Sequence, residues 1–262
     1  MPVSRAELRG LAELPASEVD IVERWTTRSG VRIRYLDNAP AAPVGLPILF
    51  SPGLSDFADE YLQMLAFFSP RRVLAVEVRG RGQSEAPANG YTVTNHVSDL
   101  VAVLDEERIA RFHLMSFSRG TSWALELALA QPDRVASMSI GDYKAFEKGL
   151  LPTFTEDQMV SRFRGRPMTE RVQPHVLAGL AADSRDRQLW HRLPELPFPL
   201  LVAQPGSGSG LVTDAVVAQY RAVRPDVEVV VVPDAAHDIF RPDRLYYPRA
   251  VAAFIAARCP GM

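Results

Sequence analysis

The sequence predicts an α/β fold, with an eight-stranded, mostly parallel sheet, helices on both faces and a small helical cap. Three observations favour this fold. Short, continuously apolar segments alternate with segments of helical spacing, which is typical of a parallel sheet covered on both faces. An alternating hairpin near the N-terminus adds an antiparallel edge. After the sixth strand, a stretch without strand signals, residues 145–196, interrupts the alternation.

The strands are expected in two groups. Residues 21–28 and 31–36 alternate apolar and polar side chains around Ser29-Gly30, which is typical of a β-hairpin. The other six expected strands are short apolar runs that end in turn residues: 47–50, 73–78, 112–115, 135–140, 199–203 and 227–232.

Helices are expected between these strands. Residues 94–108 place Val97, Leu100, Val101 and Leu104 on one helical face. The remaining expected helices cover residues 119–131, 212–223 and 243–258.

Residues 145–196 are interpreted as an inserted cap of short helices, whereas residues 1–144 and 197–262 form the core. Ligands of open α/β sheets bind outside the carboxyl ends of the strands. A cap inserted after the sixth strand would lie over that edge, where it would form the roof of a pocket.

Composition and charge exclude several classes of function. The chain has 262 residues and a net charge of −2, so it offers no basic surface for nucleic acid. Its single cysteine, Cys259, excludes an internal disulfide and favours a reducing compartment. Residues 1–20 lack the apolar core of a signal peptide, and no stretch approaches about 18 uninterrupted apolar residues. We therefore expect a soluble cytoplasmic protein without a membrane partner.

The stretch MSFSRG, residues 115–120, lies between an apolar run and a helical segment. A G-x-S-x-G nucleophile elbow occurs in this strand–turn–helix context. Aligned with that pattern, S-F-S-R-G places Ser118 at the nucleophile and Ser116 and Gly120 at the two positions where the sharp turn requires small residues. The alternative is an ordinary small-residue turn, because short motifs also match by chance.

Three further segments occur in the order of a known family. They are VLAVEVRGRGQSEAP (73–87), QPDRV (131–135) and VVVVPDAAHDIF (229–240). With the elbow, they resemble the α/β-hydrolase family over about residues 21–258. The resemblance implies the α/β-hydrolase fold, a triad in the order Ser, acid, His, and hydrolysis as the commonest activity.

His237 is the predicted base, because it lies on a loop after the last strand, at the same sheet edge as Ser118. An imidazole there can take the serine proton and pass it to the leaving group. The acids on either side, Asp234 and Asp238, are expected to cap the loop or to be solvated. Four other histidines fall in predicted helix, strand or cap: His96, His113, His175 and His191.

The acid is not at the family's usual place after the seventh strand. In QPGSGSGLVTD (204–214), Gly210 occupies the position expected for the aspartate, and Asp214 lies one helical turn later. Asp142, directly after the sixth strand, is the favoured acid, since some branches of the family resembled carry theirs there. Asp214 and a site without an acid remain alternatives.

The oxyanion hole is expected to use the backbone N–H groups of Leu54 and Arg119. The family usually has a His-Gly pair after the third strand, whereas SPGLSDF (51–57) has Ser51 instead of the histidine. The side chain of Arg119 is expected to pair with a carboxylate such as Asp56 or Asp59, or to contact substrate.

Substrate choice is assigned to the cap. Arg162, Arg164 and Arg166 could grip a carboxylate, which suggests a small carboxylate-bearing substrate. The alternative is a solvated, salt-bridged face, because residues 145–196 hold seven arginines and one lysine against seven acids. A homodimer is an open alternative to a monomer.

The predicted function is a serine hydrolase that cleaves an ester, lactone or amide bond through an acyl-enzyme on Ser118. The alternatives are a non-hydrolytic lyase, isomerase or cyclase of the same fold, and a non-catalytic binding protein. GSGSG (206–210) resembles a dinucleotide loop, but Leu211 stands where the last glycine is required. No H-E-x-x-H motif or Cys/His cluster occurs, so neither a metal nor another cofactor is expected.

Overall fold

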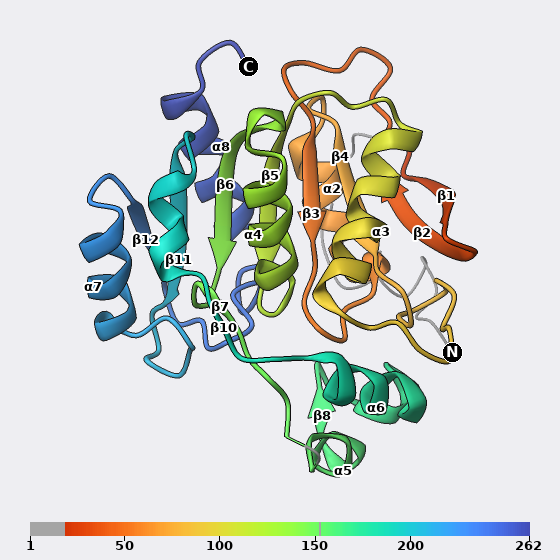
Figure 1. The fold of residues 1–262 in the computed structure, drawn as a ribbon. Helices are drawn as coiled ribbons and strands as arrows, with labels where there is room; N and C mark the ends of the chain where they lie inside the picture. The colour runs from red at the N-terminus through yellow and green to blue at the C-terminus, as the bar shows by residue number, and fades with distance from the viewer. Residues whose placement is uncertain (1–18, 152) are drawn as a thin grey trace.

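A single eight-stranded sheet organises the computed structural model, which describes residues 19–151 and 153–262 (Figure 1). The strand order is β1-β2-β4-β3-β5-β6-β11-β12. β1 and β2 form an antiparallel hairpin, β2 pairs antiparallel with β4, and the other neighbours are parallel. The strands are β1 (Val22–Arg28), β2 (Val31–Asp37), β3 (Ile48–Ser51), β4 (Val73–Glu77), β5 (Phe112–Phe117), β6 (Val135–Gly141), β11 (Leu200–Pro205) and β12 (Glu228–Val232). The predicted fold class is therefore confirmed.

Two helical layers cover the sheet. Side chains of α3 (Val93–Glu106), α4 (Gly120–Ala130) and α7 (Asp214–Val223) belong to one apolar cluster, on the near face in Figure 1. Side chains of α2 (Leu62–Phe68) and α8 (Tyr246–Arg258) belong to a second cluster on the opposite face. The short 3₁₀ helices η1 (Ala58–Tyr61) and η2 (Pro132–Arg134) precede α2 and β6. The sequence pattern did not predict η1 and α2.

The central strand β5 shows why its sequence is apolar throughout. All six of its residues are buried. Leu114 belongs to the cluster on one face and Met115 to the cluster on the other, because successive side chains of a strand point in opposite directions. Both faces of β5 are thus covered. The strand ends within the MSFSRG stretch, and the turn begins at Ser118.

The segment 145–196 contains helices and, contrary to expectation, four two-residue strands. Its helices are α5 (Phe154–Val160), η3 (Met168–Glu170), α6 (Pro174–Asp183) and η4 (Trp190–Glu195). β7 (Phe146–Glu147) pairs with β10 (Arg187–Gln188), and β8 (Arg162–Phe163) pairs with β9 (Arg166–Pro167). Two-residue pairs are too short to leave a periodic sequence signal. In Figure 1, α5, β8 and α6 lie beyond the sheet edge to which the β6 arrow points.

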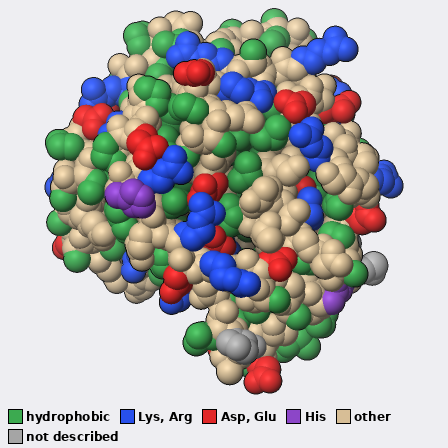
Figure 2. Space-filling view, viewed as in Figure 1, with side chains coloured by type: hydrophobic (Ala, Val, Ile, Leu, Met, Phe, Trp, Pro, Cys, Tyr) green, Lys and Arg blue, Asp and Glu red, His purple; other side chains and the backbone are tan. Residues whose placement is uncertain are grey.

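Within the described residues, no helix is long and apolar enough to cross a membrane, and no group of three or more His, Cys, Asp or Glu side chains could hold a metal ion. The prediction about a signal peptide concerns residues that lie mostly outside the described part. Cys259 is buried and carries a free thiol. Basic and acidic side chains are interspersed over the face in Figure 2, which shows no extended patch of one charge.

Candidate active site

Ser118 lies in a strained turn between β5 and α4. Its φ of +50° falls in the left-handed region, and its N–H donates to Gly141 O at 2.8 Å. A Cβ at Gly120 would lie 2.1 Å from Pro52 O, so the helix can approach the loop after β3 only with glycine there. The Ser116 hydroxyl lies 3.0 Å from Thr121 Oγ1, inside the strand–helix packing. The turn thus has the backbone of a nucleophile elbow.

His237 lies against Ser118. Its Nε2 is 2.9 Å from Ser118 Oγ, although the two residues are 119 positions apart. The ring stacks on Phe117, with 5.4 Å between centroids, and 36% of the His237 side chain is exposed. The loop after β12 therefore brings the predicted base to the predicted nucleophile and leaves its ring partly open to solvent.

Asp142 lies on the other side of the imidazole. Its Oδ2 is 2.6 Å from His237 Nδ1, and its side chain is fully buried. The same carboxylate accepts backbone N–H groups from Leu211, at 2.9 Å, and Val212, at 2.7 Å. Buried carboxylates persist in proteins when they are hydrogen-bonded in this way. Asp214 accepts instead from Gln204 Nε2, at 2.7 Å, and is the first residue of α7 rather than an interior residue.

The N–H groups of the glycine-rich loop after β11 donate hydrogen bonds to other parts of the protein. The Gly206 N–H donates to Val232 O, the Ser207 N–H donates to Ala235 O, and the Leu211 N–H donates to Asp142. These N–H groups are directed at protein oxygens, which leaves them unavailable to cradle the phosphates of a dinucleotide.

The two backbone groups predicted for the oxyanion hole are not used in hydrogen bonds within the described residues. Within residues 19–151 and 153–262, neither the Leu54 N–H nor the Arg119 N–H donates to a protein acceptor. Asp56 Oδ2 braces the loop by accepting the Gly53 N–H at 2.7 Å, and Arg81 Nε donates to Leu54 O at 2.6 Å. Ser51 Oγ donates to the carbonyl of the elbow glycine at 2.9 Å.

These hydrogen bonds hold the loop in which Ser51 replaces the family's histidine, and the sequence did not reveal them. Tyr61 contributes through its hydroxyl, which donates to Asp56 Oδ2 at 2.6 Å. The only sequence signals were an aspartate three residues after Gly53 and the arginine in RGRG. Burial raises the pKa of the Asp56 carboxyl. Burial, together with the charge of Arg119, lowers the pKa of Arg81 to about 9.

The side chain of Arg119 points away from the expected partners. Its Nη1 donates to Lys148 O at 3.0 Å, and its Nη2 lies 3.7 Å from Glu147. The expectation of a pair with Asp56 or Asp59 is wrong, because the chain direction at the start of α4 carries this side chain towards β7. Asp59 pairs instead with an arginine of β2.

The cap arginines have different environments. Arg162 donates to Gly165 O and is exposed. The side chain of Arg164 is 6% exposed and makes a two-pronged ion pair with Asp238, at 2.8 and 2.9 Å. Burial opposes ionisation of the Asp238 carboxyl, but the hydrogen bonds and charge of Arg164 outweigh it, so its pKa lies below the ordinary value. Asp238 also caps its loop, as one of the two expectations had it, by accepting the Phe240 N–H at 3.3 Å. The expectation of solvation is wrong for this pair, because the salt bridge is buried.

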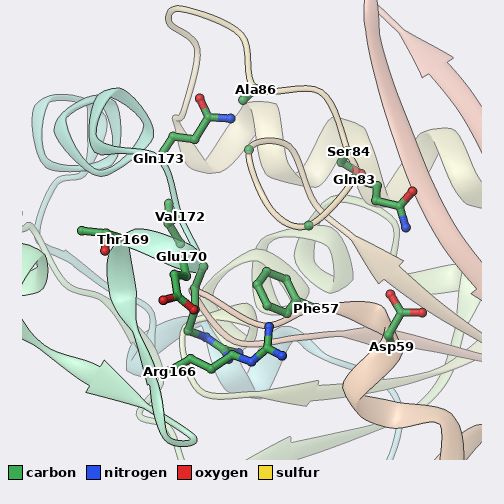
Figure 3. Close-up of a pocket in the computed structure, with 13 residues that line it drawn as sticks. Phe57, Asp59, Gln83, Ser84, Ala86, Arg166, Thr169, Glu170, Val172 and Gln173 are labelled. Atoms are coloured by element: carbon green, nitrogen blue, oxygen red, sulfur yellow. The ribbon is translucent and has the colours of Figure 1, made fainter. Parts of the chain in front are cut away.

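A pocket of about 230 Å³ opens between the loop after β4 and the segment 145–196 (Figure 3). Phe57, Gln83, Ser84 and Ala86 line it from the core side. The segment 145–196 contributes Arg166, Thr169, Glu170, Arg171, Val172 and Gln173. Neither Ser118 nor His237 belongs to its lining, so this pocket does not include the candidate nucleophile or base.

Comparison with known proteins identifies relatives over most of the chain. A model described as the alpha/beta hydrolase family matches residues 48–254. A Bacillus subtilis protein, provisionally named 2-succinyl-6-hydroxy-2,4-cyclohexadiene-1-carboxylate synthase, is 21% identical over 88% of this chain and 97% of its own. The 2-(acetamidomethylene)succinate hydrolase of Mesorhizobium japonicum is 24% identical over 80% of this chain and 88% of its own.

Solved structures agree on the fold. The enol-lactonase from Burkholderia xenovorans LB400 superimposes with a TM-score of 0.73 and 19% identity, over 89% of this chain and all of its own. At that identity the similarity shows the fold alone.

Proposed function

This chain belongs to the alpha/beta hydrolase family, and on that premise we propose that it is a serine hydrolase acting on an ester, lactone or amide bond of a small molecule. One observation carries the proposal. Ser118 Oγ, the His237 ring and the Asp142 carboxylate form a continuous hydrogen-bonded chain, with steps of 2.9 and 2.6 Å. A serine, an imidazole and a buried carboxylate in this order are the elements of an activated nucleophile.

In this proposal Ser118 Oγ attacks the substrate carbonyl carbon while its proton passes to Nε2 of His237. Asp142 holds Nδ1 and stabilises the imidazolium, and the N–H groups of Leu54 and Arg119 stabilise the oxyanion. The imidazolium then protonates the leaving alcohol or amine, which leaves an acyl-enzyme. Water, deprotonated by His237, adds to the acyl carbon and releases the carboxylic acid and the free serine.

The test is intact mass after incubation with a fluorophosphonate. We expect one adduct on the wild type, none on Ser118→Ala, and one on Ser116→Ala, which removes the neighbouring serine hydroxyl. An unlabelled wild type, or a labelled Ser118→Ala, would contradict the proposal.

We extend the proposal to substrates that carry a carboxylate. The names of two relatives, a succinate hydrolase and a carboxylate synthase, refer to such compounds. The buried guanidinium group of Arg81 contacts the oxyanion loop through the hydrogen bond from its Nε to Leu54 O. Within the described residues, Arg81 Nη2 is buried and has no hydrogen-bond partner. Uncompensated positive charge in a buried site favours an anion.

Matched neutral and anionic esters of the same alcohol test this extension. We expect a higher kcat/KM for the anionic ester, with the difference shrinking at high salt as the field is screened. Equal values for both esters would remove the carboxylate from the proposal.

A second candidate is a non-hydrolytic reaction at the same residues. The observation that favours it is the synthase name of the Bacillus subtilis relative, which matches along 97% of its length. Reaction in isotope-labelled water separates the two candidates, since hydrolysis places one solvent oxygen in the acid product. A product without solvent oxygen would favour the second candidate.

A further inference from the structure

We propose that Arg164, at the tip of the β8–β9 hairpin of the cap, is a positioning residue that holds the histidine loop and the oxyanion loop in register. The histidine loop carries His237, and the oxyanion loop carries Leu54. Because this proposal rests on the proposed function, its test includes a measurement that addresses Ser118 alone.

The contact with the histidine loop is a bidentate ion pair. Arg164 Nε lies 2.8 Å from Asp238 Oδ2, and Nη2 lies 2.9 Å from Asp238 Oδ1. Asp238 directly follows His237 in the chain. A two-pronged pair fixes both distance and orientation, which a single hydrogen bond does not. The guanidinium therefore restrains the backbone that presents the imidazole to Ser118.

The contact with the oxyanion loop runs through the group around Asp56. Arg164 Nη1 lies 3.1 Å from Glu60 and 3.9 Å from Asp56, and Nη2 lies 3.4 Å from the Tyr61 hydroxyl. Asp56 Oδ2 accepts hydrogen bonds from the Tyr61 hydroxyl and from the N–H of Gly53, the residue before Leu54. One guanidinium thus touches the braces of both loops.

The neighbouring rings fix the guanidinium in place. Its central carbon lies 5.3 Å from the Tyr61 ring centroid, 5.0 Å from Phe163 and 6.0 Å from Phe117, which also stacks on His237. Only 6% of the Arg164 side chain is exposed. Each of its three nitrogens already faces a protein oxygen, so the side chain is committed to protein partners and does not serve as a grip for substrate.

The pair also sets the charge next to His237. Asp142 contacts the imidazole of His237 directly, and Asp238 follows His237 in the sequence. Arg164 and Arg241 both face Asp238, and Arg241 Nε lies 3.4 Å from Asp238 Oδ2. Removing Arg164 leaves Asp238 with Arg241 as its remaining ion-pair partner, so less of its charge is neutralised and the imidazolium is favoured. Removing the Asp238 charge leaves Arg164 to disfavour it. The two changes are therefore expected to act on His237 in opposite directions.

The experiment compares Arg164→Gln, Arg164→Lys and Asp238→Asn with the wild type. The matched control is Arg162→Gln, which alters an exposed arginine of the same hairpin. Hydrolysis of p-nitrophenyl acetate is measured against pH, active sites are counted by fluorophosphonate titration, and the melting temperature reports folding. For Arg164→Gln we expect kcat per active site to fall about 10- to 100-fold, the scale of a misplaced catalytic group, while KM changes much less.

The pH profile distinguishes positioning from a purely structural role. The acid limb of kcat/KM should move to higher pH in Arg164→Gln and to lower pH in Asp238→Asn. In Arg164→Lys the acid limb should return to its wild-type pH, because the positive charge is kept. kcat should stay low, since a single ammonium cannot span both loops. Arg162→Gln should leave kcat and the limb unchanged.

Two results would overturn the proposal. One is a lower melting temperature in Arg164→Gln with kcat per active site and the acid limb unchanged, which would mean that the residue only supports folding. The other, decisive where Arg164→Gln yields no folded protein, is an unmoved limb in Asp238→Asn. A wild type that does not react with the fluorophosphonate would refute the proposed function itself.

Discussion

The carboxylate of Asp142 occupies the space that a side chain at Gly210 would need. A Cβ at Gly210 would lie 2.8 and 2.9 Å from the two Asp142 carboxylate oxygens, and 2.3 Å from Pro205 Cγ. The residues directly after Gly210, Leu211 and Val212, donate their N–H groups to that carboxylate. The missing acid at position 210 and the aspartate after β6 are thus parts of one arrangement, because the loop after β11 makes room for Asp142 and binds it.

Asp142→Asn is expected to lower kcat about 10³- to 10⁴-fold, with little change in KM, because the amide cannot stabilise the imidazolium or hold the required tautomer. Steady-state kinetics and the rate of fluorophosphonate labelling measure it. Asp214→Asn is the matched control, since it alters the other candidate acid, whose carboxylate binds Gln204. Near wild-type activity in Asp142→Asn would show that Asp142 is not the acid of the triad. A comparable loss in Asp214→Asn would show that the effect is not specific to Asp142.

Gly210→Ala is expected to displace the Asp142 carboxylate and to lower kcat about 10²-fold, the effect of a misplaced catalytic group. The added methyl group would meet carboxylate oxygens and Pro205, none of which can withdraw freely. Ser209→Ala, on an exposed neighbouring position, controls for general effects on the loop. Comparable kinetics in the two variants would show that the loop tolerates the clash without moving Asp142.

Much of the site could be predicted from the sequence because it depends on local chain direction. Ser118 is fixed by a strand–turn–helix pattern, and Asp142 by the end of a strand. The carboxyl ends of parallel strands meet at one edge, so residues after β5, β6 and β12 must converge. The geometry brings Ser118, Asp142 and His237 together as expected.

The residues that the sequence did not reveal act across long separations. Arg164 and Asp238 are 74 positions apart, and each alone resembles a solvated surface charge. Only the fold of the cap brings them into one buried pair. The helix α2 was missed for another reason: its sequence, LQMLAFF, is short and almost uniformly apolar, so periodicity could not distinguish it.

Gly53→Ala is expected to weaken the oxyanion loop. A Cβ there would lie 2.6 Å from Asp56 Oδ2, the atom that accepts the Gly53 N–H. Displacement of this brace would shift the adjoining Leu54 N–H, and loss of one oxyanion donor typically costs about 10²- to 10³-fold in kcat. The measurement is kcat per titrated active site, together with the melting temperature. An unchanged kcat in a folded variant would remove Leu54 from the oxyanion hole.

The buried histidine of β5 should make stability depend on pH. His113 is 1% exposed, and burial, with Arg71 and Arg111 nearby, lowers its pKa to about 4. An unfolded histidine has a pKa of about 6.5, so between these values the unfolded chain binds a proton that the folded chain does not. The contribution of His113 to stability is therefore complete above about pH 6.5 and is lost as the pH falls towards 4, by up to about 3 kcal/mol.

His113→Leu tests this dependence, because leucine keeps an apolar side chain in the strand and removes the titrating group. Free energies of unfolding from urea titrations at several pH values should fall less steeply towards acid in this variant than in the wild type. Buried carboxyls with raised pKa, such as those of Asp56, Glu77 and Asp99, also titrate, but their contribution cancels in the difference between the two proteins. Parallel profiles would contradict the prediction, and Arg162→Gln, an exposed substitution, should reproduce the wild-type slope.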